Sequence, residues 1–558
     1  MHMQESMRGS RWLALLGGLV IGWMHAVISP VMVNTAAQVS APDVPIAQSY
    51  MPVILNDPAE LISPPVDPAA PWTPQVSALV NALRLDEKIS LVHAGPDPAP
   101  LGQAGYTPGV PRLGIPPRRD ADALGINVWQ DATAWPTRLG IAASFDRSAA
   151  LKLGRGEGAE GRALGVDMLY GPQVDLDRTP NFFRNMTTFG EDPYLAAQLA
   201  VQEVNGVQSQ GLMDEPKHLA MYNGQNFDIP SIVDEQTAHE MYLVPFEAAD
   251  KEGLPAAFMC SYAIFQITPL EADSAYACEN GLLLNDILRG QWGFKGFVLS
   301  DFGATHSVSI LQGLDTSFPY VHFNLFDTPL RALVDPVSPK YDPAYAAALD
   351  QSVARILYQM ERFGLLDCAS PSGMVANCSL SPRPALNKST DAVVSERLAE
   401  ESAVLLKNEG NVLPLNQNVL QQGVAVIGPT ADLLPASPGG ERSRGFSDRN
   451  LISPLAALRN LAPGARFIFS PGVDRLGTLV PVSAFPDGLV RTQSDSTSPQ
   501  IDAQINFSAS NPLNPGITYT WRGNLDVPTS DTYALWLQTS CGQVTANGAI
   551  DPVGPPPL

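Results

Sequence analysis

Residues 291–307, QWGFKGFVLSDFGATHS, place a carboxylate, Asp301, at the end of the apolar run 297–299 and directly before a glycine-containing turn. Short continuous apolar runs indicate parallel strands that are covered by helices, and barrel enzymes carry their reacting groups where such strands end. We therefore predict a buried strand that delivers the acid Asp301 to a pocket. An Asp after a strand also caps helices or shapes turns, so this interpretation needs support from other segments.

Further polar blocks precede this segment. In chain order they are Arg112-Leu113-Gly114-Ile115-Pro116-Pro117 leading to Asp122, Arg184-Asn185 followed by Phe189-Gly190-Glu191-Asp192-Pro193-Tyr194, Lys217-His218, and Met259-Cys260-Ser261-Tyr262 before residues 283–294. With Ser300-Asp301-Phe302, these blocks resemble glycoside hydrolase family 3, the β-glucosidase group, whose nucleophile is the Asp of a Ser-Asp-Trp motif. The alternative is a different (β/α)8 enzyme with acids at its strand ends, and it requires the ordered blocks to match by coincidence.

The resemblance implies a retaining mechanism with Asp301 as the nucleophile. Retaining glycosidases use two carboxyl groups about 5 Å apart, one to attack the anomeric carbon and one to protonate the leaving oxygen. The attacking carboxylate must be ionised, so it needs cations or hydrogen-bond donors beside it. We expect Lys217 and Arg184 to provide them.

The resemblance also assigns sugar-binding roles to Asp122, Arg184, Lys217, His218, Tyr262 and Phe302. Asp122 lacks the usual Asp-Gly-Pro context, which leaves Asp120 as a substitute. Phe302 replaces the usual Trp, so it should stack more weakly as an aromatic wall. Tyr262 is expected to donate a hydrogen bond near the nucleophile, although a buried Tyr with a satisfied hydroxyl is the default.

The charged members of this set have structural alternatives. Lys217 and His218 would donate hydrogen bonds to vicinal sugar hydroxyls, whereas outside the family an adjacent Lys-His pair is usually surface decoration. Arg184 would place its planar guanidinium in the site, or else pair with Glu191 or Asp192.

The general acid of the resembling family is a Glu in a loop of its second, sandwich domain, and we do not find that loop in this chain. Glu409 lies in a structural turn block and Glu441 in a Gly/Ser/Arg-rich loop, so both are expected to be structural or exposed. The sequence predicts an O-glycosyl hydrolase that cleaves terminal β-D-glucosyl residues. A truncated, catalytically weak sugar-binding remnant is the alternative.

The positions of proline and glycine and the periodicity of the apolar residues indicate how the chain divides into segments. Residues 1–41 combine arginines with an apolar stretch, which predicts a signal peptide or membrane anchor, and residues 42–71 form a Pro-rich tether. Residues 72–367 alternate short apolar runs with helical stretches. That alternation indicates βαβ units and, over about 300 residues, a (β/α)8 TIM-like barrel. Residues 368–391 are predicted to be a linker.

The remaining residues begin two further units. Residues 392–476 are expected to start an incomplete α/β sandwich domain, with a helix through Val404 and Leu406 and a buried strand at 424–427. Alternating residues in 477–558 predict antiparallel strands of an incomplete protective-antigen-type β-domain. The predicted fold class is therefore α/β: a barrel, the start of a sandwich domain and a partial antiparallel β-domain.

Composition limits the partners. A formal net charge of -22 and a pI near 4.6 disfavour nucleic acid and anionic lipid surfaces. We expect β-glucosides or short β-linked oligosaccharides as substrates, with membrane attachment only if the N-terminal segment stays uncleaved. No Cys-x-x-Cys or His cluster has metal-ligand spacing, so we predict no metal and no cofactor.

An export segment predicts a secreted or periplasmic protein, where cysteines can oxidise. Cys260 and Cys278 could pair, Cys368 and Cys378 bracket a segment that contains Pro, Ser and Asn, and Cys541 would be left over. Spacing alone does not establish these pairs.

Overall fold

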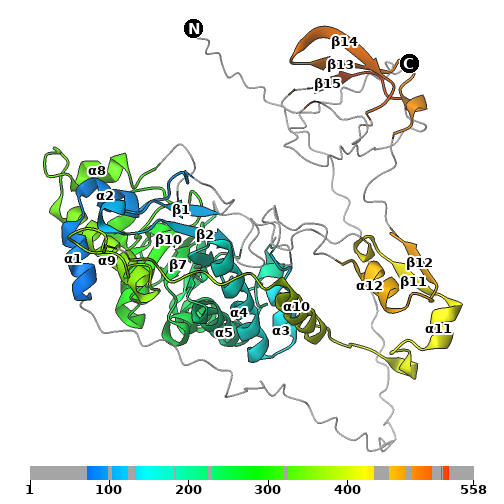
Figure 1. The fold of residues 1–558 in the computed structure, drawn as a ribbon, viewed down its shortest axis with the longest axis horizontal. Helices are drawn as coiled ribbons and strands as arrows, with labels where there is room; N and C mark the ends of the chain where they lie inside the picture. Colours follow the sequence, from blue (N-terminus) through cyan, green and yellow to red (C-terminus); the bar gives the residue numbers. More distant parts are fainter. Residues whose placement is uncertain are drawn as a thin grey trace, which may run out of the picture. The chain divides into compact units, whose positions relative to one another are not determined.

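A computed structural model describes residues 72–526 except for residues 99–103, 123–131, 181, 183, 224–228, 319–323, 377, 433–451, 473–479, 506–513, 515–516 and 518. The predicted export segment and tether, together with Cys541, lie outside the described residues. The fold is mixed α/β (Figure 1). None of the helices that these residues form has the length and apolar character needed to cross a bilayer.

Short, mostly parallel strands form the centre of residues 72–318. One sheet has the order β1-β2-β3-β4 and a second has the order β10-β7-β5. Their bounds are β1 (Gly105–Thr107), β2 (Arg118–Asp122), β3 (Met168–Tyr170), β4 (Met213–Asp214), β5 (Lys217–Leu219), β7 (Ala257–Cys260) and β10 (Phe297–Ser300). Parallel bridges continue the pairing between and beyond the two sheets, at Gln173–Lys217, Leu299–Thr316 and His93–Ser317.

The first strand pair departs from the predicted succession of parallel strands. β1 runs antiparallel to β2, with Tyr106 opposite Arg119. Residues 108–117 join them, and this connection holds only the 3₁₀ turn η1 (Pro111–Leu113). Antiparallel strands accept such a short connection, whereas a parallel crossover needs a dozen or more residues.

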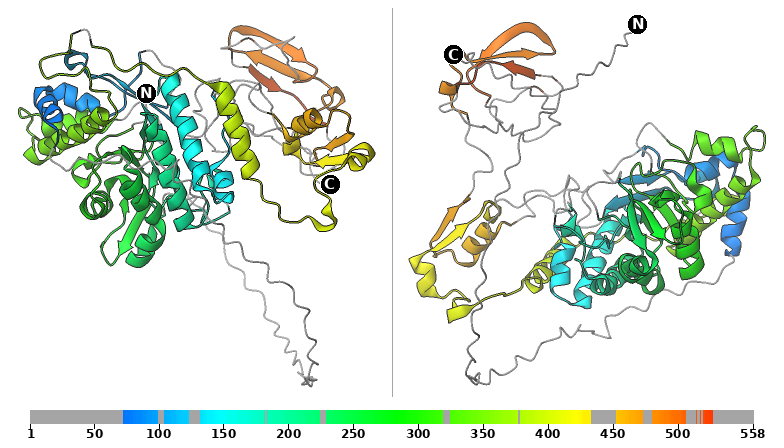
Figure 2. Two further views of the ribbon diagram at one scale, coloured as in Figure 1. Left: turned by 60° about the horizontal axis from the view of Figure 1, so that its bottom comes forward. Right: turned by 180° about the vertical axis from the view of Figure 1, so that it is seen from behind.

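Helices surround these strands. They are α1 (Pro74–Ala82), α2 (Leu85–Leu91), α3 (Arg138–Ala143), α4 (Arg147–Leu164), α5 (Pro193–Ser209), α6 (Glu235–Thr237), α7 (Val244–Ala248), α8 (Thr328–Val334) and α9 (Pro343–Arg362). α4 and α5 lie side by side (Figures 1 and 2). A Cβ at Gly154 or Gly206 would collide with the backbone of the other helix, so glycine permits this close approach.

Residues with capping roles lie at the ends of two helices. Asp192 accepts hydrogen bonds from the backbone N–H groups of Tyr194 and Leu195 at the start of α5. α9 ends just before Gly364, which has φ 71°, a left-handed conformation that glycine adopts readily at the end of a helix.

Shorter elements complete this part of the chain. A small sheet contains β6 (Ser231–Asp234), β8 (Ile264–Thr268) and β9 (Ala275–Tyr276). π-helical turns are η3 (Ala238–Tyr242), η4 (Ala249–Gly253) and η6 (Leu282–Trp292). Further 3₁₀ turns are η2 (Asn185–Thr187), η5 (Ala277–Glu279) and η7 (Ser309–Gln312).

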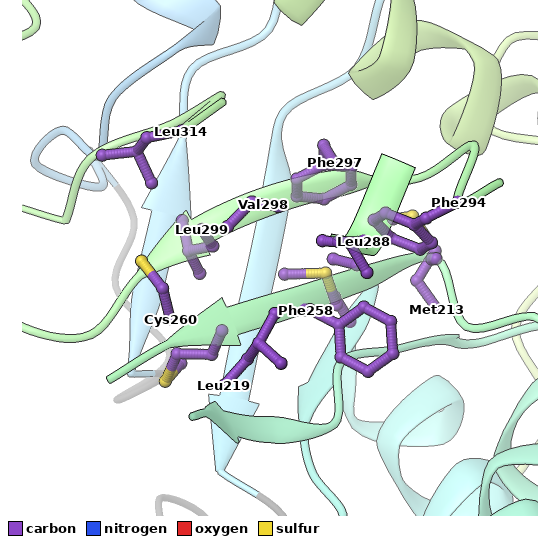
Figure 3. Close-up of a cluster of buried hydrophobic side chains, with 14 of the residues drawn as sticks. Met213, Leu219, Phe258, Cys260, Leu288, Phe294, Phe297, Val298, Leu299 and Leu314 are labelled. Atoms are coloured by element: carbon purple, nitrogen blue, oxygen red, sulfur yellow. The ribbon is translucent and has the colours of Figure 1, made fainter. Parts of the chain in front are cut away.

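The core lies between the strands and their helices. Figure 3 shows Phe297, Val298 and Leu299 of β10 beside Phe258 of β7, and all four are fully buried. Because both faces of these strands are covered, their sequences are continuous apolar runs.

Both cysteine pairs that the sequence left open are disulfides. Cys260–Cys278 joins the end of β7 to η5, and Cys368–Cys378 closes a short loop after α9.

The C-terminal elements begin with α10 (Lys388–Glu401), which starts inside the predicted linker. They continue with η8 (Glu409–Asn411), α11 (Gln417–Gln422), β11 (Val424–Ile427), η9 (Pro429–Ala431), α12 (Pro454–Leu461), β12 (Phe467–Ser470), η11 (Val482–Ala484), β13 (Leu489–Gln493), β14 (Ser496–Asp502) and β15 (Tyr519–Arg522). β11 pairs with β12 in parallel, and the sheet β14-β13-β15 is antiparallel.

The predicted helix through Val404 and Leu406 is wrong. α10 ends at Glu401, and both residues lie outside it with exposed side chains. The consecutive apolar residues 404–406 cannot share one face of a helix, because neighbouring helical residues point about 100° apart.

Candidate active site

Most of the predicted site residues lie where parallel strands end. Asp122 is the last residue of β2, Lys217 and His218 lie in β5, Tyr262 follows β7, and Asp301 follows β10. Strands that run in the same direction bring their carboxyl ends to one edge, so residues far apart in the sequence meet there.

Asp301 is buried, and its two carboxylate oxygens have different surroundings. Oδ1 accepts a 2.7 Å hydrogen bond from the backbone N–H of Phe302, and the Tyr262 hydroxyl lies 3.1 Å from it. The same hydroxyl lies 2.6 Å from the backbone carbonyl of Phe302. Oδ2 is buried, with no hydrogen-bond partner among the described residues.

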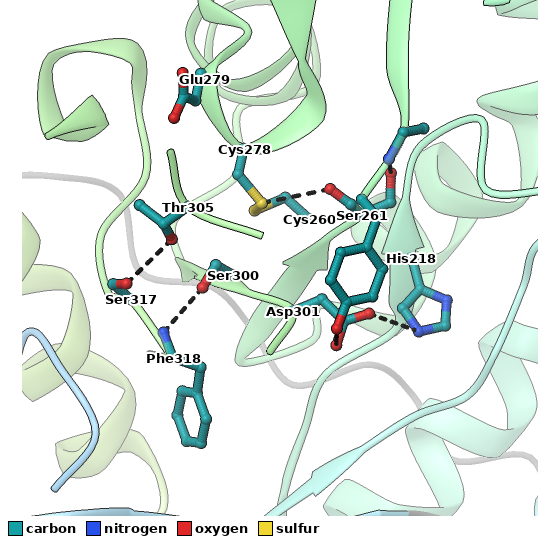
Figure 4. The surroundings of a disulfide bond; sticks show 12 residues. His218, Cys260, Ser261, Cys278, Glu279, Ser300, Asp301, Thr305, Ser317 and Phe318 are labelled. Carbon is teal, nitrogen blue, oxygen red and sulfur yellow. Dashed lines mark hydrogen bonds and ion pairs between the residues drawn. A yellow bond between two sulfur atoms is a disulfide. The ribbon is translucent and has the colours of Figure 1, made fainter. Parts of the chain in front are cut away.

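His218 faces the second oxygen of Asp301. Its Nε2 lies 3.5 Å from Asp301 Oδ2, and its Nδ1 lies 2.8 Å from Oδ2 of Asp175. Figure 4 marks the contact between His218 and Asp301 with a dashed line. The imidazole is fully buried and packs on the Tyr222 ring, with centroids 4.4 Å apart. Both ring nitrogens therefore face protein carboxylates, which differs from the predicted donation to sugar hydroxyls.

Lys217 is buried, in contrast to a surface pair. Its Nζ lies 2.7 Å from Oδ1 of Asp122, whose side chain is 24 % exposed. Asp120, the proposed substitute for Asp122, is fully buried and receives the Arg118 guanidinium and the Tyr170 hydroxyl. Asp122 is thus the acid at this position that reaches the site edge.

Arg184 and Phe302 complete the predicted set. The Arg184 guanidinium carbon lies 5.9 Å from the centre of the Tyr222 ring. Its charge acts on the carboxylates of Asp175 and Asp301. Phe302 follows Asp301 in the chain, is 38 % exposed and packs edge-on against Phe318.

Burial and neighbouring charges shift the pKa values of Asp301, Asp175 and His218. Burial raises the pKa of Asp301, while Lys217, the Phe302 N–H, Arg184 and the Tyr262 hydroxyl act to lower it. Burial also raises the pKa of Asp175 well above its usual range. The pKa of His218 lies well below its usual value because of burial and the neighbouring cations Arg184 and Lys217. Shifted pKa values of this kind are typical of functional sites.

Sequence reasoning missed two members of this cluster. Asp175 lies five residues after the end of β3, and Tyr222 lies three residues after the end of β5. The nearest sequence signal was their position soon after apolar strands.

The candidate acids of the second domain add nothing to this cluster. Glu409 is exposed and pairs with Lys407 at 3.3 Å, and Glu441 lies outside the described residues. Within the described ranges, no three His, Cys, Asp or Glu side chains gather as metal ligands would.

Comparison with known proteins agrees with this geometry. Residues 110–317 match the N-terminal domain of glycosyl hydrolase family 3. Beta-glucosidase B of Emericella nidulans is 32% identical over 374 residues, which cover 65% of this chain and 40% of that protein. Thermostable beta-glucosidase B of Acetivibrio thermocellus is 33% identical over 360 residues, or 62% of this chain and 43% of that protein.

A solved structure extends the likeness to the fold. DesR, a beta-glucosidase from Streptomyces venezuelae solved in complex with D-glucose, is 35% identical with a TM-score of 0.64, covering 75% of this chain and 53% of that one. The chain thus spans about half the length of these relatives or less. The chain therefore carries the N-terminal domain of glycosyl hydrolase family 3 at residues 110–317, and over the span that it shares with these relatives it is similar to β-glucosidases.

Proposed function

We propose that the protein is an exported glycosidase that removes terminal non-reducing β-D-glucosyl residues with retention of configuration. The observation that carries this proposal is the Asp301 carboxylate, buried at the end of β10 with its hydrogen-bond donors, inside the domain that matches family 3. The glucose-bound relative supports a glucoside as substrate.

Asp301 would act through Oδ1, because Oδ2 is enclosed beside His218. In the first step, a bond forms between this oxygen and the anomeric carbon while the bond to the leaving oxygen breaks, and the leaving oxygen takes a proton from a general acid. Water then attacks the same carbon, gives up its proton to the general base and releases Asp301 as a carboxylate. The residue that serves as acid and base is not assigned.

Sugar recognition would use the exposed edge of the cluster. Asp122 and Lys217 form a charge-assisted pair, and both can exchange part of that contact for sugar hydroxyls. The Arg184 guanidinium would contribute positive charge near the sugar and the carboxylate. The exposed part of the Phe302 side chain would form an aromatic wall beside the leaving group.

The proposal includes three features of the whole protein. The described strands would belong to a barrel of the (β/α)8 type, which the parallel bridges at His93, Gln173 and Thr316 support. The antiparallel sheet β14-β13-β15 would belong to a protective-antigen-type domain. Export is supported by the two disulfides, since such bonds persist mainly in oxidising compartments.

Hydrolysis of two substrates tests the proposal. Purified wild type and Asp301→Asn are compared on an aryl β-glucoside with a good leaving group and on cellobiose. We expect wild type to cleave the aryl glucoside and the variant to lose at least about 10³-fold, since removing a nucleophile costs that much or more. Cleavage of cellobiose as well would indicate that a general acid operates in this chain. Failure on both substrates would indicate a sugar-binding remnant or another sugar, and near-wild-type rates in the variant would exclude Asp301.

A further inference from the structure

Asp175, His218 and Asp301 form a line of contacts that the proposed reaction leaves unexplained. Asp175 Oδ2 lies 2.8 Å from Nδ1 of the imidazole, and Nε2 lies 3.5 Å from Oδ2 of Asp301. All three side chains are buried. Asp301 Oδ2 has no hydrogen-bond partner among the described residues.

The atoms at these contacts determine how many protons the line must hold. Carboxylate oxygens only accept hydrogen bonds, and an imidazole nitrogen without a proton also only accepts. Each of the two contacts therefore joins two acceptors unless a proton lies between them. A neutral imidazole with ionised acids supplies one proton, which leaves one buried contact repulsive and unsatisfied.

Asp175 is built to hold the imidazole in place. Its Oδ2 also lies 3.2 Å from the backbone N–H of His218 and 3.0 Å from Nε2 of Gln173. Tyr222 packs on the ring face. The ring is therefore fixed along the direction from Asp175 to Asp301.

We propose that Asp175 is a positioning residue for the nucleophile: it fixes His218 so that the Nε2–H of the imidazole donates to Oδ2 of Asp301. The line then carries two protons, one at each contact. This proposal rests on the role of Asp301 given above and adds a residue that does not touch the sugar.

The surrounding charges are compatible with this assignment. Lys217 and Arg184 act on the three side chains of the line, and Tyr262 acts on Asp301. Asp301 in turn acts on Tyr222 and on the buried Glu215. Burial favours the neutral imidazole over imidazolium and raises the pKa of both acids, which favours retention of the second proton.

The hydrogen bond has a consequence for the reaction. A donor on Oδ2 stabilises the Asp301 carboxylate before attack and again when the ester is hydrolysed. Without it, the pKa of Asp301 rises, so the nucleophile is protonated at a higher pH. The acid limb of kcat/KM should then move to higher pH.

Asp175→Asn tests this at constant volume. The single oxygen of the amide would replace Oδ2, accept the Nδ1–H and leave Nε2 without a proton. We expect kcat on the aryl glucoside to fall by roughly 10²- to 10⁴-fold, the range for a lost proton-transfer group or a histidine held in the wrong tautomer. KM should change little, and the acid limb should move to higher pH. Asp177→Asn, in the same segment but bonded to Thr188, is the matched control and should leave the acid limb unchanged.

Nitrogen NMR of protein labelled at its seven histidines gives a readout independent of turnover. The signal of His218 is assigned by its loss in His218→Gln. We expect Nε2 to carry a proton in the wild type, and Asp301→Asn and Asp175→Asn to change the tautomer signals. Nε2 without a proton in the wild type would overturn the proposal, whether or not the protein is active.

Two other outcomes separate the alternatives. If Asp175→Asn loses melting temperature and rate while its pH profile stays that of the wild type, Asp175 is merely structural and the proposal fails. If the wild type hydrolyses no glucoside but Nε2 carries its proton towards Asp301, the proposed function fails and the hydrogen-bond assignment stands.

Discussion

At the scale of single residues, the two oxygens of Asp301 have distinct tasks. Oδ1 receives the Phe302 N–H and lies near the Tyr262 hydroxyl, whereas Oδ2 faces His218. If His218 donates to Oδ2 as proposed, the carboxylate is held at both oxygens and cannot rotate, so the proposed attacking lone pair is fixed before substrate arrives. Such preorganisation costs no rearrangement at the moment of reaction.

Tyr262→Phe tests the donor on Oδ1. The variant removes a hydroxyl 3.1 Å from the carboxylate, and a hydrogen bond to a charged group is worth about 1.5–3 kcal/mol. Because this donor lowers the pKa of Asp301, its loss raises that pKa, and the acid limb of kcat/KM should move to higher pH. A pH–rate profile of the aryl glucoside measures the shift. Tyr276→Phe, which removes a hydroxyl from a ring stacked on His306, is the control, and equal profiles for both variants would contradict the assignment.

The sequence revealed part of this site. Asp301 follows an apolar run that could be recognised as a strand end, whereas Lys217 and His218 could be assigned only from the family resemblance. Asp175 could not be assigned, because its partner His218 is 43 residues away and their contact depends on where the segments after β3 and at β5 pass each other. The burial of Lys217 was equally invisible, since adjacent basic residues carry no mark of the fold around them.

At the scale of elements, Asp315 joins three segments. It accepts hydrogen bonds from the Val298 N–H in β10, from Arg289 in η6, and from Ser352 and Arg355 in α9. β10 ends directly before Asp301, the proposed nucleophile, so the fully buried Asp315 carboxylate also helps to fix the strand that positions it.

Asp315→Ala should destabilise the fold by roughly 3–5 kcal/mol, because it leaves the buried Arg289 guanidinium without its counter-charge. Chemical denaturation measures the loss. Asp350→Ala removes a partner of Lys88 at a side chain that is 46% exposed, and should cost less than about 1 kcal/mol. Similar losses for the two variants would show that Asp315 does not join these elements.

Asp214, a buried acid in β4, gives a prediction in which the substitution increases the stability of the fold as the pH rises. Asp214 has no hydrogen-bond partner at either oxygen in the described structure. Burial and the neighbouring Glu203 raise its pKa well above the usual range. A raised folded-state pKa gives stability that is complete below the unfolded-state pKa, about 3.9, and is lost as pH rises through the folded value.

Asp214→Asn removes this titration. The variant should therefore gain stability relative to the wild type as pH rises, with the smallest difference near pH 4.5 and the largest at pH 8. Urea unfolding at several pH values measures the trend. Asp495→Asn, in the exposed turn between β13 and β14, should show no such trend. A difference for Asp214→Asn that stays constant with pH would contradict the raised pKa.

As with the site residues, some of the helices and strands could be predicted from the sequence and others could not. The alternation of short apolar runs and helical stretches over residues 72–367 could be predicted, because the period of apolar residues is a local signal. The antiparallel β1 and the end of α10 before residue 404 were missed, since pairing direction and packing partners come from distant segments.

At the scale of the whole molecule, charge and oxidation state bear on export. An excess of acidic residues at a formal net charge of -22 keeps a protein soluble and suits a neutral sugar substrate. The Cys260–Cys278 disulfide constrains the strand next to the one that leads to Asp301, because Cys260 ends β7 and β7 pairs with β10.

Counting thiols tests the proposed export. The chain has five cysteines, and the two disulfides use four of them, so denatured and unreduced protein should show one reactive thiol per chain. Protein made in a reducing compartment should show five. It should also be less stable, by about 3 kcal/mol for the loop that Cys260–Cys278 closes, since an open loop adds entropy to the unfolded state. Cys260→Ser/Cys278→Ser should reproduce that loss without reductant and show one thiol as well. Protein secreted with five thiols would contradict the predicted compartment, while unchanged stability in the double variant would show that this disulfide does not restrain the fold.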